Sequence, residues 1–459
     1  MNTEQWIAAD KAHCWHPFTR QDDWVAGEPT EPLVLVHGEG VWLTDSEGRR
    51  YIDGNASIWT NVHGHKHPVI NAAIFAQLEK VAHTSYLGFA NPRASELASR
   101  LCGFFPSQTL ERVFFSDDGS TAVECALKMA MQYHLQTGQQ ERTGFIAFDQ
   151  AYHGDTMGAA SLGGVGAFFD RFRKFGFPVH HVGGLDDLNA LDQEVIDQTA
   201  AVIIEPMVQG VNQIHVWPRG MLTELRGWCD QHGIHLILDE VMTGFGRTGK
   251  MFACQHEGVI PDFLCLAKGL SGGYLPLAAT MVRGEIYEAF LGGADKAFYY
   301  GHSYTANQLG CAAALASLDV FGQERTLEQL PEKIALLSAL LAELAERIPL
   351  IHEIRQCGMV AGIELRDENG AHFDPSLRVG EKLSLLARGH QLLTRPILDT
   401  LVIMPPLSIS KDEIEFMCSA LSRALDDYLT GTDGTKLGSA GPGRDEAVAQ
   451  INNNDETNQ

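Results

Sequence analysis

The chain has 459 residues, of which 45% are hydrophobic and 20% are charged. This length exceeds the size at which one hydrophobic core usually stops growing, so we expect two domains. The formal net charge is −24, and an acidic surface repels both nucleic acid and anionic membranes. We therefore expect small-molecule partners and neither nucleic acid nor a membrane.

The N-terminal segment and the cysteines bear on the cellular location. Residues 1–18 lack the basic and apolar regions of a secretory signal, and no uninterrupted apolar stretch is long enough to span a membrane. The nine cysteines are scattered without CxxC pairs, which is typical of reduced thiols and not of a disulfide framework. We expect a cytoplasmic protein, and we assign no metal site.

The first two thirds of the chain predict an α/β domain. Residues 41–54 contain two alternating apolar runs around a polar turn with glycine, which predicts a β-hairpin. Between about residues 70 and 325, short apolar runs alternate with amphipathic stretches such as 120–134, whose apolar side chains recur at helical spacing. The apolar runs are 112–116, 145–148, 201–206, 235–240 and 263–269. Strands buried on both faces have this pattern, which favours a largely parallel sheet.

The last third of the chain has a different pattern. Residues 331–347 predict a helix with proline in its first turn, and residues 358–367 and 392–406 predict strands. A closing helix follows at 410–429, where Ser410 and Glu413 have the spacing of a capping box. The sequence after Leu429 is too polar and Gly-rich to bury a core.

These patterns suggest how the chain divides. We expect residues 66–325 to form a large domain, and residues 1–65 and 326–430 to form the two parts of a smaller domain. We expect residues 431–459 to be a disordered tail.

Asp239 is the first residue that points to chemistry. It follows the apolar run 235–238, at or near the C-terminal end of an expected strand, and ligands of open α/β sheets bind at that edge. A buried carboxylate needs a cationic partner, and a protonated pyridine nitrogen would serve. An aspartate in this place also fits a simple cap on the following turn.

Lys268 follows another apolar run and precedes a Gly-rich turn. Burial at a strand end lowers the pKa of a lysine and favours the neutral amine that acts as a nucleophile. A single lysine in such a place is more often a surface residue that extends into solvent. The pair carries more weight, because Asp239 and Lys268 end two strands separated by one crossover. They could hold the two ends of an aromatic aldehyde.

Two further motifs complete the candidate site. The segment 116–124 opens a helix with Gly119 and Ser120, and the amides, hydroxyls and positive dipole of a helix start can cradle a phosphate. Ser and Thr are also ordinary helix caps, so this motif alone is weak. Tyr152 offers a flat face for stacking on an aromatic cofactor, although a lone aromatic is more often simple core packing.

Together these motifs resemble a known family. Residues 239–253 (DEVMTGFGRTGKMFA) and 261–279 (PDFLCLAKGLSGGYLPLAA) are similar to the signature of class III aminotransferases, which depend on pyridoxal phosphate. Within that class, the aminotransferases of biotin synthesis have segments that resemble 13–19, 53–68, 152–156 and 395–406. The resemblance runs in unbroken order over about residues 10–428. It implies the type I fold, with a mostly parallel sheet in the large domain and a smaller α+β domain.

The resemblance implies a role for each matching residue around the cofactor. Lys268 is implied to be the Schiff-base lysine that also moves the proton, and Asp239 to pair with the pyridine nitrogen. Gly119 and Ser120 are implied to bind the phosphate.

The ring of the cofactor is implied to lie between two side chains, Val241 on one face and Tyr152 on the other. Glu205 matches a carboxylate near the cofactor, and Asp155 an aspartate that positions groups around Tyr152.

The resemblance also implies contacts from a second subunit and contacts to the substrate. A neighbouring subunit is implied to add Ser303 to the phosphate site, with Gly301 and His302 at the adjacent backbone positions. A homodimer with shared active sites follows. Arg395 matches the arginine that takes the substrate carboxylate, a task that suits the guanidinium fork. Alone, it is also credible as a solvent-facing arginine at a strand end.

The sequence departs from the family pattern around the substrate. Phe18 stands where a tyrosine is common, Ile58–Trp59 where two tryptophans are common, and Val402 where another tyrosine is common. Most of the family uses S-adenosylmethionine as amino donor, and a branch with a similar pattern uses lysine. The implied activity is therefore amination of 8-amino-7-oxononanoate to 7,8-diaminononanoate by either donor, with Trp59 and Phe18 along the substrate.

Two alternatives stay open. Another class III enzyme, an ω-amino-acid or diamine aminotransferase, would keep both Lys268 and Asp239. A catalytically silent binding protein of the same fold would be expected to lose one of them.

Overall fold

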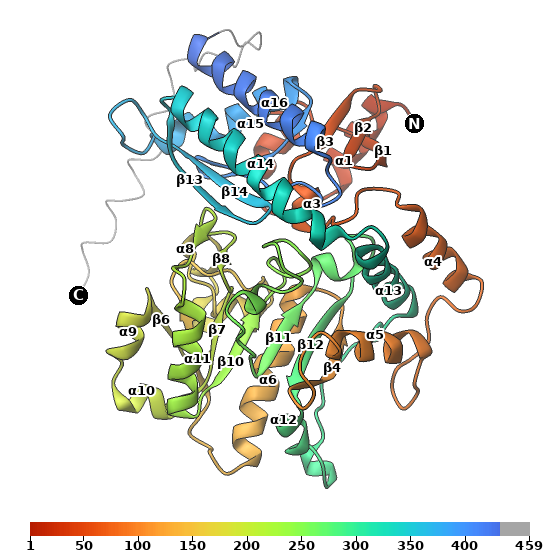
Figure 1. The fold of residues 1–459 in the computed structure, drawn as a ribbon, viewed down its shortest axis with the longest axis vertical. Coiled ribbons are helices and arrows are strands. Elements are labelled where there is room, and N and C mark those ends of the chain that lie inside the picture. Colours follow the sequence, from red (N-terminus) through yellow and green to blue (C-terminus); the bar gives the residue numbers. More distant parts are fainter. Residues whose placement is uncertain (432–459) are drawn as a thin grey trace. The chain divides into compact units, whose positions relative to one another are not determined.

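The computed structural model describes residues 1–431, and Figure 1 traces its elements. The contacts group the described residues into a large unit, Leu35–Leu425, and a small unit that combines Met1–Val34 with residues 426–431. The predicted boundaries after residues 65 and 325 stay a prediction. Except for Gly431, the predicted disordered tail lies outside the described residues.

A seven-stranded sheet forms the centre of the large unit, in the order β4-β12-β11-β10-β7-β5-β6. Its strands are β4 (Leu110–Ser116), β5 (Gly144–Phe148), β6 (Val179–Val182), β7 (Thr199–Ile204), β10 (His235–Asp239), β11 (Phe263–Leu266) and β12 (Ala278–Arg283). All neighbours are parallel except β12, which runs antiparallel to both β4 and β11. The predicted α/β fold with a mostly parallel sheet is confirmed.

Helices cover this sheet and supply its core. Helix α6 (Gly119–Gln136) packs against β4, β7, β10, β11 and β12. Its buried side chains form one cluster with those of the strands. Helix α11 (Met221–His232) packs on β10, and α13 (Gln308–Gln323) packs on α4 (Pro68–Leu78) and α5 (Pro92–Cys102). The helix predicted at 120–134 is thus confirmed as the middle of α6.

Two four-stranded sheets lie outside the central one. The first has the order β1-β2-β3-β15 and contains β1 (Leu35–Glu39), β2 (Trp42–Asp45), β3 (Arg50–Asp53) and β15 (Leu392–Leu393). The second has the order β13-β14-β17-β16 and contains β13 (Ile351–Cys357), β14 (Val360–Leu365), β16 (Arg395–Ile397) and β17 (Thr400–Ile403). The antiparallel pair β2–β3 confirms the predicted hairpin. Strand β15 then joins β3 in parallel, so residues far apart in sequence share this sheet.

The C-terminal helices are α14 (Thr326–Arg347), α15 (Val379–Gly389) and α16 (Lys411–Thr430). The prediction that α14 has its proline in the first turn is wrong, because the helix begins at Thr326 and includes Pro331. Leu330, just before the proline, is fully buried, and this packing keeps the earlier turn helical although proline lacks an N–H group. The capping box of α16 is confirmed, since Ser410 and Glu413 bond each other's amides.

The remaining elements are short. They are α3 (Ala56–Trp59), α7 (Met157–Ser161), α8 (Gly166–Phe169), α9 (Leu185–Asn189), α10 (Gln193–Gln198), α12 (Gly284–Glu288), β8 (Val208–Gln209), β9 (His215–Val216) and the 3₁₀ turns η1 (Arg173–Phe175), η2 (Ala253–His256), η3 (Lys268–Ser271), η4 (Ala294–Lys296) and η5 (Pro375–Leu377).

The small unit contains α1 (Thr3–His13) and α2 (Gln21–Ala26). Asn2 and Gln5 form a capping box at the start of α1. Asp10 accepts hydrogen bonds from Trp24 of α2 and from His16 between the helices, both at 2.9 Å, which ties both to α1. Within residues 1–431, no helix has the length and apolar character needed to cross a membrane.

Candidate active site

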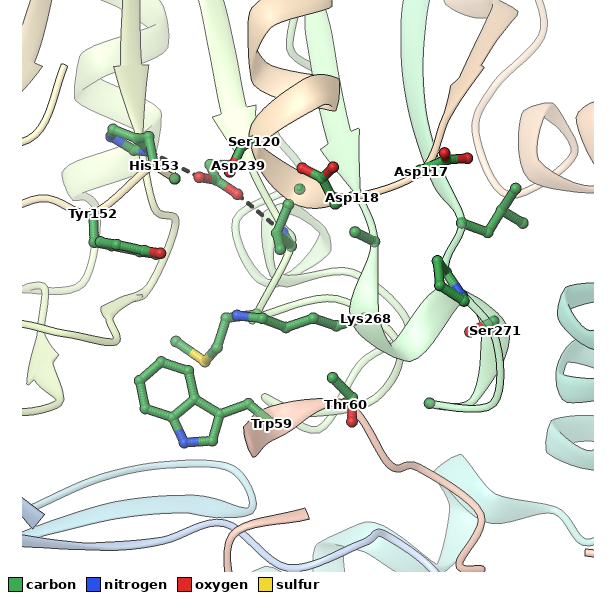
Figure 2. Close-up of a pocket in the computed structure, with 18 of the residues that line it drawn as sticks. Trp59, Thr60, Asp117, Asp118, Ser120, Tyr152, His153, Asp239, Lys268 and Ser271 are labelled. Carbon is green, nitrogen blue, oxygen red and sulfur yellow. Dashed lines mark hydrogen bonds and ion pairs between the residues drawn. The ribbon is translucent and has the colours of Figure 1, made fainter. Parts of the chain in front are cut away.

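A cavity of about 520 Å³ lies at the C-terminal ends of β10 and β11 and the start of α6. It brings together Trp59, Gly119, Ser120, Tyr152, Asp239, Val241 and Lys268, which the sequence predicted as site residues. In Figure 2, the Lys268 side chain extends between the Trp59 indole on one side and Asp239 on the other, with Tyr152 beyond its amine. The residues that the sequence places at strand ends therefore share one cavity.

Lys268 is the first residue of η3, and Ala267 alone separates it from the end of β11. Its amine lies 5.1 Å from the centroid of the Trp59 ring. Burial lowers the pKa of the amine, and the negative charges of Asp239 and Glu205 partly oppose this effect. Lys268 has a positive φ of 42°, which is strained for a lysine and is typical of residues that a functional site constrains. The environment thus favours a neutral, nucleophilic amine.

Asp239 is the last residue of β10, and its carboxylate is held from two sides. The Val241 amide donates to Oδ1 at 3.1 Å, and His153 Nδ1 donates to Oδ2 at 2.7 Å. Asp239 lies beside Lys268 because β10 and β11 are neighbours whose register pairs Asp239 with Cys265. This carboxylate is buried and fixed, as a permanent partner for a cation must be.

The sequence did not predict the role of His153. Its side chain is buried and lines the cavity, with its bond to Asp239 on one ring nitrogen. The only local signal was its place beside Tyr152. Its partner is remote in sequence, so no spacing rule identifies the pair.

The start of α6 forms a cradle with free backbone donors. The Asp118 side chain caps the Thr121 amide at 3.0 Å, whereas the amides of Gly119 and Ser120 precede the first helical hydrogen bond. A Cβ on Gly119 would lie 2.7 Å from Val241 Cγ1, so only glycine fits there without displacing Val241. The Ser120 hydroxyl accepts the Asp155 amide at 3.1 Å, which leaves its proton free to donate.

Tyr152 is anchored at both its backbone and its hydroxyl. The hydroxyl donates to Asp155 Oδ2 at 2.6 Å, and the Tyr152 amide donates to Glu205 Oε1 at 3.2 Å. Burial, followed by the bond to Asp155, raises the pKa of the phenol above its ordinary value. Tyr152 is therefore a neutral phenol with a fixed ring, as a stacking role requires.

Glu205 is buried behind Tyr152, and its second oxygen accepts the Gly210 amide at 2.8 Å. Burial raises the pKa of this carboxyl to about 7, with Asp239 adding to the effect and His153 opposing it. Two carboxyl groups of the cavity wall therefore differ: Asp239 is an anchored carboxylate, whereas the pKa of Glu205 is raised to about 7.

Trp59 ends a left-handed helical turn. The residues of α3 have φ values of 44° at Ala56, 49° at Ser57, 62° at Ile58 and 69° at Trp59. None of them is glycine, and L-residues in this conformation cost about 1–2 kcal/mol each. The turn still has helical hydrogen bonds, such as Thr60 N to Ala56 O at 2.9 Å. Sequence periodicity cannot reveal this handedness.

The structure does not gather every predicted residue in the cavity. Gly301, His302 and Ser303 lie in a loop outside its lining, although His302 Nδ1 is 3.4 Å from the carboxylate of Asp117, which does line it. Phe18 belongs to the small unit, so its role stays a prediction.

Arg395 is exposed on β16, opposite Val402 in the register of β17. Val402 is buried in one apolar cluster with Met242, and Trp59 packs against that cluster. Arg395 does not line the cavity, and its register partner Val402 connects it to the apolar cluster of Met242 and Trp59.

The residues of the cavity fit pyridoxal phosphate. The cradle of Gly119 and Ser120 suits a phosphate, the anchored carboxylate of Asp239 suits a pyridinium nitrogen, and the amine of Lys268 suits an aldehyde. A ring between Tyr152 and Val241 would connect these groups, and all of them line the same cavity.

The pattern that defines the family "Aminotransferase class-III" matches residues 25–425. The chain therefore belongs to the class III aminotransferases, and it is a pyridoxal-phosphate-dependent enzyme.

The chain is also similar to individual aminotransferases, both in sequence and in solved structure. The chain is 46% identical to the adenosylmethionine-8-amino-7-oxononanoate aminotransferase of Nitratidesulfovibrio vulgaris, over 91% of this chain and 80% of that protein. It is 44% identical to the enzyme of the same name from Geobacter sulfurreducens, over 91% and 96%. The solved structure of this aminotransferase from Methanocaldococcus jannaschii has a TM-score of 0.89 at 36% identity, over 93% of this chain and 99% of that one. An (S)-enantioselective ω-transaminase from Thermomicrobium roseum has a TM-score of 0.88 at 35% identity, over 94% and 99%.

Proposed function

We propose that this chain transfers an amino group to 8-amino-7-oxononanoate and forms 7,8-diaminononanoate, a step of biotin synthesis. The observation that carries the proposal is the similarity to aminotransferases named for this acceptor, at 46% and 44% identity over 91% of the chain. The cavity is compatible with that substrate, because Trp59, Val211 and Met242 give it an apolar wall beside Lys268. The acceptor has a long apolar chain that such a wall would bury.

The cofactor, when bound, supplies an electron-accepting ring that acidifies the carbon bearing the amine, and it carries nitrogen from donor to acceptor. Lys268 would hold its aldehyde end, and the neutral amine of Lys268 would take and return the proton of that carbon. Asp239 would keep the ring nitrogen protonated, because its carboxylate is fixed by His153 and by the Val241 amide.

Other residues would hold and orient the reacting groups. Ser120 would donate its hydroxyl proton to the phosphate, while the amide of Asp155 occupies an acceptor site on its oxygen. Tyr152 would cover one ring face and exclude water from it. Arg395 would bind the carboxylate of the substrate in a bidentate geometry.

The donor separates two versions of this proposal. The relatives from Nitratidesulfovibrio vulgaris and Geobacter sulfurreducens are both named for adenosylmethionine. We therefore expect S-adenosylmethionine to convert the enzyme from its pyridoxal-phosphate form to its pyridoxamine-phosphate form, and lysine is the alternative donor. The test presents each donor separately to the pyridoxal-phosphate form, then adds 8-amino-7-oxononanoate and measures 7,8-diaminononanoate by mass spectrometry. Absence of this product with both donors would overturn the proposal.

An ω-amino-acid or diamine aminotransferase is the competing function. The TM-score of 0.88 to an ω-transaminase supports keeping this alternative. A screen with β-alanine, putrescine and pyruvate separates the two functions. Turnover of these amines without turnover of 8-amino-7-oxononanoate would favour the competitor.

We further propose that two copies of the chain share their active sites. The loop of residues 299–305 lies against the segment 82–91, where His83 Nε2 donates to the Ser303 carbonyl at 2.7 Å. Large apolar side chains are exposed on both segments, including Leu87 at 87%, Tyr299 at 82% and Phe89 at 69%. A second copy that buries this surface would also receive Ser303 near its cofactor phosphate.

Mixing two impaired variants tests this shared site. In a hybrid of Lys268→Ala and Ser303→Ala subunits, one site would combine an intact Lys268 with an intact Ser303 from its partner. Unfolded and refolded together, the two variants should recover activity that neither has alone. No gain in activity, or a monomer by sedimentation, would contradict the shared site.

We place the reaction in the cytoplasm, where nine free cysteines would stay reduced.

A further inference from the structure

The left-handed turn Ala56–Trp59 has a built-in support outside the cavity. We propose that Asp53 and His65 are positioning residues that hold this turn closed and thereby fix the Trp59 indole opposite Lys268. The effect on substrate affinity rests on the function proposed above, whereas the effect on Trp59 itself does not.

Asp53 binds the turn with both carboxylate oxygens. Oδ1 accepts the Ser57 amide at 2.9 Å, and Oδ2 accepts the Ser57 hydroxyl at 2.7 Å and His65 Nε2 at 3.0 Å. Burial would raise the pKa of this carboxyl, but the bonds from His65 and Ser57 outweigh it and hold the pKa below its ordinary value. The side chain is therefore a buried carboxylate whose donors come from the strained turn and from a more distant residue.

The backbone on each side of this support is rigid. A Cβ on Gly54 would lie 2.5 Å from Leu392 Cδ1 and 2.8 Å from the Leu393 carbonyl, so the segment after Asp53 lies tightly against β15. The Met404 amide also donates to the Gly54 carbonyl at 2.8 Å. His65 is fixed by a two-way backbone pairing with Gly40. Asp53 and His65 thus belong to a frame that does not depend on the turn.

The other end of the turn determines where Trp59 points. Its indole N–H donates to Asn55 Oδ1 at 2.8 Å, across the turn. The ring fills the space beside Gly210, where a Cβ would lie 2.9 Å from Trp59 Cζ3. If Ala56–Trp59 relaxed to a right-handed conformation, the Cα–Cβ bond of Trp59 would change direction and the indole would leave this position. The contacts that hold the turn in its left-handed conformation therefore also fix the position of the indole.

Asp45 provides a matched control in the same sheet. Asp45 and Asp53 are both 2% exposed. Asp45 accepts hydrogen bonds from the Glu47 and Arg49 amides, from the Arg49 side chain and from the Tyr51 hydroxyl, all within the β2–β3 hairpin. Replacing either aspartate by asparagine removes one buried carboxylate from this sheet, but only Asp53 contacts the left-handed turn.

The experiment uses holoenzyme labelled with 5-fluorotryptophan and observed by ¹⁹F NMR, with Trp59→Phe assigning the Trp59 resonance. Asp53→Asn should shift or broaden that resonance, whereas Asp45→Asn should leave it unchanged. With the substrates that the enzyme turns over, Asp53→Asn should raise KM about tenfold, a shift expected of a displaced binding wall, with a smaller change in kcat. The dissociation constant of pyridoxal phosphate should stay within about twofold.

Two further comparisons keep the proposal testable. In a Trp59→Ala background, Asp53→Asn should cause no further rise in KM, because the two residues act through one indole. Ser57→Ala removes only the hydrogen bond from the Ser57 hydroxyl to Asp53, so it should shift the Trp59 resonance in the same direction but by less. This variant provides the test if Asp53→Asn does not fold. An unchanged Trp59 resonance in both variants, or an equal KM rise with and without Trp59, would overturn the proposal. Failure to aminate 8-amino-7-oxononanoate would refute the proposed function and leave the NMR result standing.

Discussion

The buried carboxyl group of Glu205 leads to a prediction of definite sign and size. Burial raises its pKa from 4.5 to about 7. Since folding raises this pKa, the folded protein keeps a proton that the unfolded chain releases. The resulting stabilisation is complete below pH 4.5 and is lost as the pH rises through 7. The shift corresponds to about 3 kcal/mol, at about 1.4 kcal/mol per pKa unit.

The assay is urea-induced unfolding of the cofactor-free protein, followed by tryptophan fluorescence at pH 5 and pH 8. From pH 5 to pH 8, wild type should lose about 2–3 kcal/mol of unfolding free energy relative to Glu205→Gln. Comparing the two proteins at each pH cancels the effect of buried histidines such as His63 and His235, whose pKa values are lowered by burial.

A second buried glutamate serves as the control. Burial also raises the pKa of Glu240 to about 7, and its oxygens accept the amides of Ala253 and Cys254. The difference in unfolding free energy between wild type and Glu240→Gln should therefore change with pH in the same way. Glu240→Gln should also leave the affinity for pyridoxal phosphate unchanged, because Glu240 does not line the cavity. A difference between wild type and Glu205→Gln that stays flat from pH 5 to pH 8 would refute the reasoning.

Three further substitutions test the cavity. Gly119→Ala should weaken binding of pyridoxal phosphate about tenfold or more by fluorescence titration, because its Cβ would lie 2.7 Å from Val241 Cγ1. Gly227→Ala in α11, where a Cβ meets nothing within 4 Å, should leave affinity unchanged, and equal affinities for both variants would contradict the cradle. His153→Phe removes a hydrogen-bond donor from the buried Asp239 carboxylate and should weaken the binding of pyridoxal phosphate by about 1–3 kcal/mol. An unaltered affinity would mean that His153 does not support Asp239. Arg395→Gln should raise KM for substrates with a carboxylate but not for simple amines, and a uniform rise would argue against its assigned role.

The sequence alone predicted the candidate site residues that lie at the ends of strands and at the start of a helix. Asp239 and Lys268 could be predicted because a continuous apolar run followed by a charged residue indicates the edge of a parallel sheet. Gly119 and Ser120 could be predicted because a helix start has a local signature. Family resemblance then connected these positions to one cofactor.

The rest depends on contacts between residues that are distant in sequence. The bond from His153 to Asp239 requires the packing of one loop on β10, and the pKa of Glu205 depends on burial that no local pattern reveals. The left-handed conformation of Ala56–Trp59 is imposed by Asp53 and by neighbouring segments, against the intrinsic preference of every residue in it. Strand β12 was not among the predicted strands, and no local pattern indicates that it pairs antiparallel with β11.

The assignment of Lys268 as the residue that holds the cofactor is the central claim, and chemical trapping tests it most directly. Borohydride reduction of the holoenzyme, followed by proteolysis and mass spectrometry, should find the pyridoxal phosphate adduct on Lys268, and Lys268→Ala should abolish both the adduct and amino transfer. An adduct on another lysine, or full activity in Lys268→Ala, would contradict the account.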